Sequence, residues 1–325
     1  MENFEFFLNG LRLNNPYMYA ENMSDKKVGK IYHYTSPNGF ESILFKDEEK
    51  VTLWASRYDC LNDMSEGTIA IKIYKETCED LLKSKEITKE QYDEIANLEA
   101  NKKEFTSYKS YNIKTYLTER VEHQKYICSF SINQDSLAMW NYYTKGNKYE
   151  GYNIGFNSLE IKCAMNRFFG TGRSGRLYPV IYHKIEQKQL IKKFLLDILK
   201  YYPTEDKKTI KYEISKQLLD WSLIFKSEYF EHEHEVRVII SIPKDSLEDV
   251  KKTSPLDIKY RNNYGYIIPY IELSFEKNCV SDVCIGPIQY NDEQKETQKK
   301  ILHERLNTNG YVLAELIYSK IPIRY

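Results

Sequence analysis

Apolar and polar residues alternate in short runs along most of the chain, and such alternation is typical of strands with one buried face. These runs predict strands at 30–35, 51–56, 126–131, 151–156, 177–183, 233–242, 267–274, 280–285 and 312–317. In the first run, Ile31 and His33 share one face, and Tyr32 and Tyr34 share the other. The chain is therefore expected to be rich in strands from near its start to its end.

Between the strands, apolar residues recur every three or four positions, which predicts helices. Asn291 and Gln294 form a capping box at the start of the last helix. Longer helical patterns cover about 68–121 and 187–225. Because strands and helices interleave, we expect an α+β protein with a mixed central sheet. Residues 30–325 would form a single domain with helical insertions at those two segments, after a polar lead-in at 1–29.

Composition narrows the classes of function. The 47 basic residues balance the 47 acidic ones, so a general electrostatic affinity for nucleic acids or anionic membranes is not indicated, although a local basic patch stays open. The six cysteines form no CxxC pair, which favours reduced thiols and a cytoplasmic location. No apolar run is long enough to span a membrane, and the first residues do not resemble a signal peptide, so we expect no membrane association.

The segment FEHEHEVRVII carries the densest group of ionisable residues. As a strand, it places Glu231, Glu233, Glu235 and Arg237 on one face. Neighbouring carboxylates raise one another's pKa unless a cation or a ligand compensates them. We therefore interpret Glu233 and Glu235 as a functional carboxylate pair. The competing interpretation is a solvated edge strand whose glutamates pair with nearby cations.

His232 and His234 alternate with these glutamates, and alternate strand positions can both ligate zinc. No third ligand stands at a standard spacing, so we expect no metal. A metal-dependent nuclease that uses these histidines and the glutamates stays open as an alternative function.

Two further segments carry polar residues in patterns that suit a nucleotide. His33, Tyr34 and Thr35 close the first strand directly before a helix N-terminus, where a ribose or a phosphate can be held. Ser129 and Ser131 share one face of a later strand. The two segments are therefore candidates for nucleotide binding.

Trp140 and Tyr143 lie three residues apart on the predicted helix that follows, so they share a helix face. Aromatic residues at this spacing are usually core residues. They also suit stacking on a nicotinamide or a base. The sequence leaves both interpretations open.

In this order, the segments resemble a bacterial family catalogued as domain of unknown function 2971. The resemblance rests on IYHYTSPNGFESIL, on LWAS followed by Asn62-Asp63 and Glu66, on CSFS, MWNYY and GYNIGF, on the ExExR pattern of Glu233, Glu235 and Arg237, and on CIGP and SKIPIRY. It covers most of residues 30–325, and the family name implies no activity.

A more distant resemblance connects the same motifs to ADP-ribosyltransferases, in which three separated motifs hold NAD. It implies that His33 grips the NAD ribose, with Tyr34 and Thr35 beside it. It also implies that Ser129 and Ser131 form the serine-bearing strand that frames the nicotinamide.

The same resemblance assigns roles to the later residues. Trp140 and Tyr143 would be the stacking surface. Glu235 would be the catalytic carboxylate and Glu233 its partner, which orients or deprotonates an acceptor. Arg237, on the same strand face, is a further candidate for contact with the nucleotide.

The resemblance implies an ADP-ribosyltransferase-like fold and an enzyme that takes NAD as its substrate and cleaves the nicotinamide–ribose bond. A protein or a nucleic acid would accept the ADP-ribose, and the enzyme would act as a toxin or a phage-defence effector. A carboxylate beside the ribose would stabilise the positive charge that develops in the transition state. A non-enzymatic sensor or adaptor that binds a nucleotide or a protein partner is an alternative that stays open.

Overall fold

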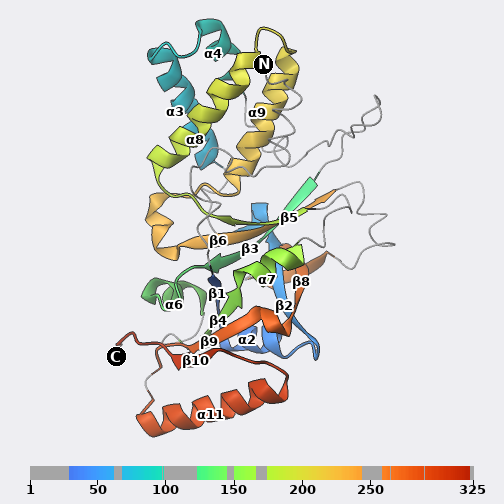
Figure 1. Ribbon diagram of the computed structural model, residues 1–325, viewed down its shortest axis with the longest axis vertical. Coiled ribbons are helices and arrows are strands. Elements are labelled where there is room, and N and C mark those ends of the chain that lie inside the picture. The colour runs from blue at the N-terminus through green and yellow to red at the C-terminus, as the bar shows by residue number, and fades with distance from the viewer. Residues whose placement is uncertain are drawn as a thin grey trace. The chain divides into compact units, whose positions relative to one another are not determined.

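The computed structural model describes residues 29–61, 68–96, 98, 123–144, 150–165, 174–243, 258–263, 265–288 and 290–322 (Figure 1). By packing, the chain divides into two compact units, each built from separate stretches. Unit 1 comprises Met1–Lys27, Leu61–Gln124 and Val180–Glu231, and unit 2 comprises Val28–Cys60, Lys125–Pro179 and His232–Tyr325. The two segments expected to be helical insertions both fall in unit 1.

Four helices are the main elements of unit 1 in the part of it that the structure describes. Helix α3 (Ile69–Lys83) packs against α8 (Lys184–Ile198) and α9 (Lys207–Ser222), and α4 (Lys89–Ile95) packs against α3 and α9 (Figure 1). A 3₁₀ turn, η4 (Leu199–Tyr201), follows α8. The pair α8 and α9 confirms the helices predicted over 187–225, and α3 and α4 confirm the first part of the prediction over 68–121. Most of 97–122 lies outside the described residues, as do nearly all of the expected lead-in and the polar residues Asn62, Asp63 and Glu66.

Local chemistry sets where these helices begin and which faces they bury. Thr88 starts α4 with a capping box to Gln91, and the Asp206 side chain accepts from the Thr209 backbone at the start of α9. The buried apolar positions of α8 recur at helical spacing and form one stripe: Leu190, Ile191, Phe194, Leu195 and Ile198. No helix among the described residues has the length and apolar character that crossing a membrane requires.

Within the described residues, unit 2 is built on one ten-stranded sheet with the strand order β10-β9-β4-β1-β3-β2-β8-β7. Strands β5 and β6 lie off this path, because β6 pairs with both β3 and β5. Strands β9 and β10 pair parallel, and the other registered pairs are antiparallel. The strands are β1 (Lys30–Thr35), β2 (Lys50–Arg57), β3 (His123–Ser131), β4 (Tyr152–Asn157), β5 (Ser174–Pro179), β6 (Glu235–Pro243), β7 (Lys259–Asn263), β8 (Tyr266–Glu276), β9 (Val280–Ile285) and β10 (Glu315–Tyr318).

The two faces of this sheet bury different clusters. The main apolar core contains the inward residues of β1, β2, β3, β6 and β8, together with residues of α2 (Pro37–Leu44), α7 (Ser158–Met165) and α11 (Asp292–Thr308). A smaller cluster joins Tyr32 and Tyr34 of β1 to Met139 and Trp140 of α6 (Leu137–Tyr143). Because alternate residues of a strand point to opposite faces, α6 lies over the face opposite the main core. The mixed α+β class predicted from the sequence is confirmed.

The structure changes several predicted strand boundaries. The strand expected at 233–242 begins only at Glu235, because Glu228–Glu233 form a 3₁₀ helix, η5, and His234 has a φ of 42°. The strand expected at 177–183 is β5, which ends at Pro179, and the last strand runs from Glu315 to Tyr318 rather than over 312–317. Strand β7 and helix α7 were not predicted.

Candidate functional site

Strand β3 is where the predicted site segments meet. It pairs with β1 at one registered position, Tyr32 opposite Ser131. Beyond that pair the His33 side chain bridges the two strands, since Nδ1 of His33 lies 3.0 Å from the Ser129 carbonyl oxygen. The ring also meets Phe130 edge-on at 5.8 Å. His33 thus links β1 to β3 beyond the one residue pair at which the backbones of the two strands are registered.

This geometry fixes the protonation of the imidazole. A carbonyl oxygen only accepts, so Nδ1 of His33 carries the proton that it donates to Ser129. Burial lowers the pKa of His33, and the Ser129 hydrogen bond opposes that effect only in part. The ring is therefore neutral at pH 7 and offers Nε2 as a hydrogen-bond acceptor. By strand alternation it lies on the face of β1 that also carries Ile31.

The C-terminal end of β3 also holds the segment that precedes β6. The Ser131 hydroxyl donates to the backbone oxygen of Glu233 at 2.6 Å and accepts from the Asn133 amide at 3.1 Å. The Ile132 amide donates to the backbone oxygen of His234 at 3.0 Å. Glu233 is therefore placed by residues about a hundred positions earlier in the chain.

The carboxyl groups of this segment are nearly buried and have defined partners. Glu233 is 5% exposed, and its Oε1 accepts from the Tyr143 hydroxyl at 3.0 Å. Glu235 is 6% exposed, and both of its oxygens accept from Arg237, at 2.8 and 2.9 Å. Such a fork-to-fork pair is the strongest geometry available to these two side chains. We call Ser131, Tyr143, Glu233, Glu235 and Arg237 the polar cluster.

Tyr143 remains a hydrogen-bond donor in this setting. Burial raises the pKa of its hydroxyl, and the nearby negative charges of Glu233 and Glu235 raise it further. The phenol is therefore protonated at every physiological pH. It donates a hydrogen bond to one oxygen of Glu233 and adds no negative charge of its own.

The expected single face of three glutamates is wrong. Glu231 lies in the 3₁₀ helix, and its Oε1 is 3.0 Å from Nε2 of His183. Glu233 ends that helix, and strand alternation begins only at Glu235. Glu233 and Glu235 still lie near one another, because both raise the pKa of Tyr143.

Three of the predicted nucleotide-binding residues serve the fold instead. Trp140 is fully buried, and its Nε1 donates to Asp135 at 2.7 Å, so it offers no open ring face to a ligand. Tyr34 meets the Trp140 ring edge-on at 4.7 Å. Thr35 lies against the start of α2, where a Cβ on Gly39 would come within 2.0 Å of the Thr35 hydroxyl. Of the predicted aromatic pair, only Tyr143 reaches the polar cluster.

The premise of the metal interpretation is also wrong, because His232 and His234 do not alternate along a strand. His232 lies in the 3₁₀ helix, with its ring tilted against Tyr142 at 5.6 Å, and His234 is exposed. Among the described residues, no group of three or more histidine, cysteine or carboxylate side chains could hold a metal ion.

Sequence reasoning missed the role of Asp135. Its carboxylate accepts from Trp140, from the Ser319 hydroxyl at 2.7 Å and from the Lys320 amide at 2.8 Å. It thus ties the end of the chain to α6, the helix that carries Tyr143. The signal in the sequence was the acidic residue before MWNYY, but nothing there indicated its distant partners.

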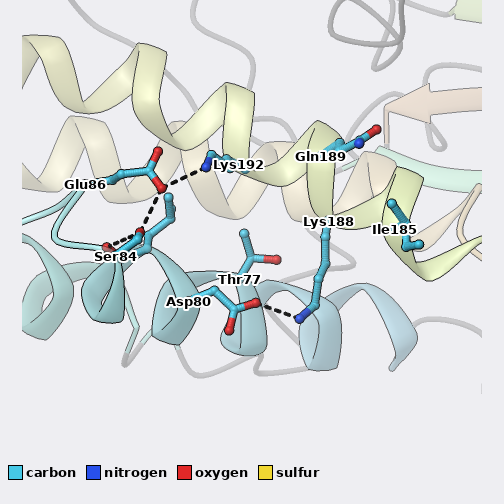
Figure 2. Close-up of a pocket in the computed structure, with 9 residues that line it drawn as sticks. Thr77, Asp80, Ser84, Glu86, Ile185, Lys188, Gln189 and Lys192 are labelled. Carbon is cyan, nitrogen blue, oxygen red and sulfur yellow. Dashed lines mark hydrogen bonds and ion pairs between the residues drawn. The ribbon is translucent and has the colours of Figure 1, made fainter.

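A hollow of about 340 Å³ lies elsewhere, between α3 and α8 of unit 1 (Figure 2). Its charged side chains already have partners: Lys188 pairs with Asp80, and Lys192 pairs with Glu86, both at 2.8 Å (Figure 2). None of the predicted site residues lines it. Its lining therefore gives no support to a nucleotide site there.

The fold and the polar cluster thus define a mixed α+β protein with a buried carboxylate site at the junction of β3 and β6. Residues 139–238 match the sequence model of the family described as Protein of unknown function (DUF2971). This stretch runs from α6 into β6 and contains four of the five residues of the polar cluster, which supports the resemblance to that family. No curated protein and no solved structure matches the chain.

Proposed function

We propose that the polar cluster binds NAD and cleaves the bond between nicotinamide and ribose, as an ADP-ribosyltransferase-like enzyme. The observation that carries the proposal is the meeting of three segments at the end of β3. Ser131 holds the backbone of Glu233, and Tyr143 holds its carboxyl group. A site that needs a serine strand, an aromatic residue and a late glutamate requires this convergence.

We propose for the two glutamates the opposite roles from those that the resemblance implied. Arg237 engages both oxygens of Glu235, so that carboxylate is committed to an ion pair. Tyr143 engages Oε1 of Glu233. In this proposal Glu233 stabilises the ribose cation, and the ion pair of Glu235 and Arg237 positions Glu233.

The reaction needs little more than an aligned negative charge. As the C1′–N bond breaks, its electron pair moves to the nicotinamide nitrogen and the ribose becomes an oxocarbenium-like cation. A nearby carboxylate stabilises that cation more strongly than the ground state, which lowers the barrier. An acceptor hydroxyl or a water molecule then bonds to C1′ and releases its proton.

His33 is not part of this site. It lies on the face of β1 that carries Ile31, whereas Ser131 stands opposite Tyr32 and shares the other face.

The test follows free nicotinamide by chromatography after incubation of the full-length protein with NAD. Compared with wild type, Glu233→Gln should lose at least about a hundredfold in rate, as expected for removal of one charge-stabilising group. The matched control is Glu228→Gln, an exposed glutamate of the same 3₁₀ helix. It should release nicotinamide at the wild-type rate.

Two outcomes would contradict the proposal. Equal release by wild type and Glu233→Gln would show that the carboxylate is not used. No release by wild type, together with an NAD-dependent rise in melting temperature, would instead establish a nucleotide-binding module. If nicotinamide is released, expression of wild type and Glu233→Gln in bacteria tests the effector role, since only the active protein should arrest growth.

A further inference from the structure

A second chemical feature lies in unit 2, on the outer face of β2, β7 and β8, and shares no residue with the polar cluster. The Arg261 guanidinium of β7 lies 5.5 Å from the ring centre of Trp54 and 6.0 Å from that of Tyr270. The two rings are 4.5 Å apart, and Arg261 also donates to the Ser56 hydroxyl at 2.9 Å. The strand registers place Trp54, Tyr270 and Arg261 on the face opposite the main core.

Among the described residues, Arg261 is a partly buried cation with no carboxylate within ion-pair distance. Burial lowers its pKa, and only Tyr270 and Cys128, neither of them a carboxylate, oppose that effect. Partial removal of a charge from water without a partner is costly, so the position favours an anion brought by a ligand.

The carboxylate opposite Trp54 is already engaged. Glu272 stands opposite Trp54 in the β2–β8 register and pairs with Lys46 at 3.1 Å and with Lys259 at 2.6 Å. Its charge is therefore shared by two lysines. The lysines also add positive charge to the face on which Arg261 lies.

Flat aromatic surface is exposed beside this cation. Trp54 is 37% exposed, and Tyr266, which shares the face of Arg261, is 59% exposed. Tyr260 is 68% exposed on the same hairpin, but strand alternation places it on the opposite face. Exposed rings next to a cation that has no carboxylate partner suit a ligand that carries both aromatic rings and anionic groups.

We infer that this face binds single-stranded nucleic acid, with bases stacked on Trp54 and Tyr266 and a phosphate on Arg261. Duplex DNA or RNA hides the faces of its bases and would not stack. An acidic peptide supplies charge but few ring faces. Because the chain has no net charge, binding should depend on this face and not on a general electrostatic attraction to the whole protein.

The experiment measures fluorescence anisotropy of a labelled oligothymidylate and a labelled oligouridylate with the full-length protein. Trp54→Ala should weaken binding by about five- to a hundredfold, and Trp54→Phe, which keeps a ring, should recover most of it. Arg261→Gln should weaken binding and reduce the salt dependence by about one phosphate contact. Tyr266→Ala should weaken binding, whereas its matched control Tyr260→Ala should not.

Stability provides the second readout. If Arg261 is held for a ligand, Arg261→Met should leave the melting temperature unchanged or raise it, because it removes an uncompensated charge. A clear loss of melting temperature would assign Arg261 to the fold and overturn the inference. So would absence of binding to either single strand, preference for a duplex or for polyglutamate, or wild-type affinity in both Trp54→Ala and Arg261→Gln.

Discussion

The strongest test of the polar cluster is the removal of Arg237. This side chain is 1% exposed and binds both oxygens of Glu235, which is itself nearly buried. Arg237→Met keeps much of the volume but removes the charge. The Glu235 carboxylate then stays in a buried site without its bidentate partner.

The magnitude follows from burial. Removing one partner of a buried ion pair costs about 3–5 kcal/mol, because the remaining charge loses that partner and stays buried. An exposed pair of the same chemistry contributes about 1 kcal/mol or less. The chain offers such a pair, since Arg305 binds both oxygens of Glu41 at 2.6 and 2.5 Å with both side chains nearly half exposed. We therefore expect Arg237→Met to cost at least about 2 kcal/mol more than Arg305→Met.

Urea unfolding followed by tryptophan fluorescence measures both variants. The chain has three tryptophans: Trp54 and Trp140 lie in unit 2 and Trp221 in unit 1. A Trp221→Phe background therefore makes fluorescence report on unit 2, where both arginines lie. The shift of the midpoint at constant slope gives the change in free energy of unfolding.

Equal losses of stability in the two variants would refute the reasoning. Burial of the carboxylate would then add nothing to the cost of removing its arginine. A second arm separates charge from packing. The double variant Glu235→Leu/Arg237→Met should recover much of the loss, since it removes both charges together.

Three other predictions concern unit 2 and use the same unfolding assay. Because of His33, unit 2 should become less stable as pH falls below about 6.5. The pKa of His33 is lowered in the folded protein, so the unfolded chain binds the proton more readily. His33→Asn should remove that pH dependence. Gly155→Ala should cost about 1–3 kcal/mol, because its Cβ would lie 2.8 Å from Oδ2 of the fully buried Asp282. Asp135→Ala should cost about 1–3 kcal/mol, because it leaves the Trp140 Nε1 proton buried without an acceptor.

Each of these has a matched control. Gly29→Ala should be nearly neutral, since a Cβ there meets nothing within 4 Å. Asp135→Asn keeps an acceptor oxygen and should lose less than Asp135→Ala. His303→Asn, at an exposed position, should not alter the pH dependence. A loss of stability in Gly29→Ala as large as that in Gly155→Ala would contradict the packing argument. A pH profile of stability unchanged by His33→Asn would contradict the argument for His33.

The sequence predicted best where one strand face is buried along its whole length. Strand β1 was predicted with its observed ends, because Ile31 packs into the main core while Tyr32 and Tyr34 pack under α6. Strand β9 and the capping box of α11 were also predicted correctly, since both depend on local pattern alone. Strand β7 was missed because its KYRNN sequence has only intermediate or exposed residues and depends on β8 for its place in the sheet.

The geometry of the candidate site, in contrast, could not be predicted from the sequence. Alternation placed Glu231, Glu233 and Glu235 on one face, but a left-handed φ at His234 ends that periodicity. Nothing in the sequence predicts this conformation, because it is stabilised from outside: Ile132 donates to the His234 carbonyl, and Ser131 donates to Glu233. A periodic pattern reports burial along one element, whereas these contacts come from another strand.

The long separation between His33 and Glu235 also has a physical explanation. One segment of the chain leaves unit 2 after β2 and returns at the start of β3, where Arg57 and Tyr126 are paired. A second segment leaves after β5 and returns at β6, where Pro179 and Val236 are paired. Both segments of unit 1 therefore begin and end at neighbouring strand ends. Loop closure costs little more for a long segment than for a short one when its ends are already held together. The sheet can accommodate both segments without altering the register that brings Ser131 to Glu233.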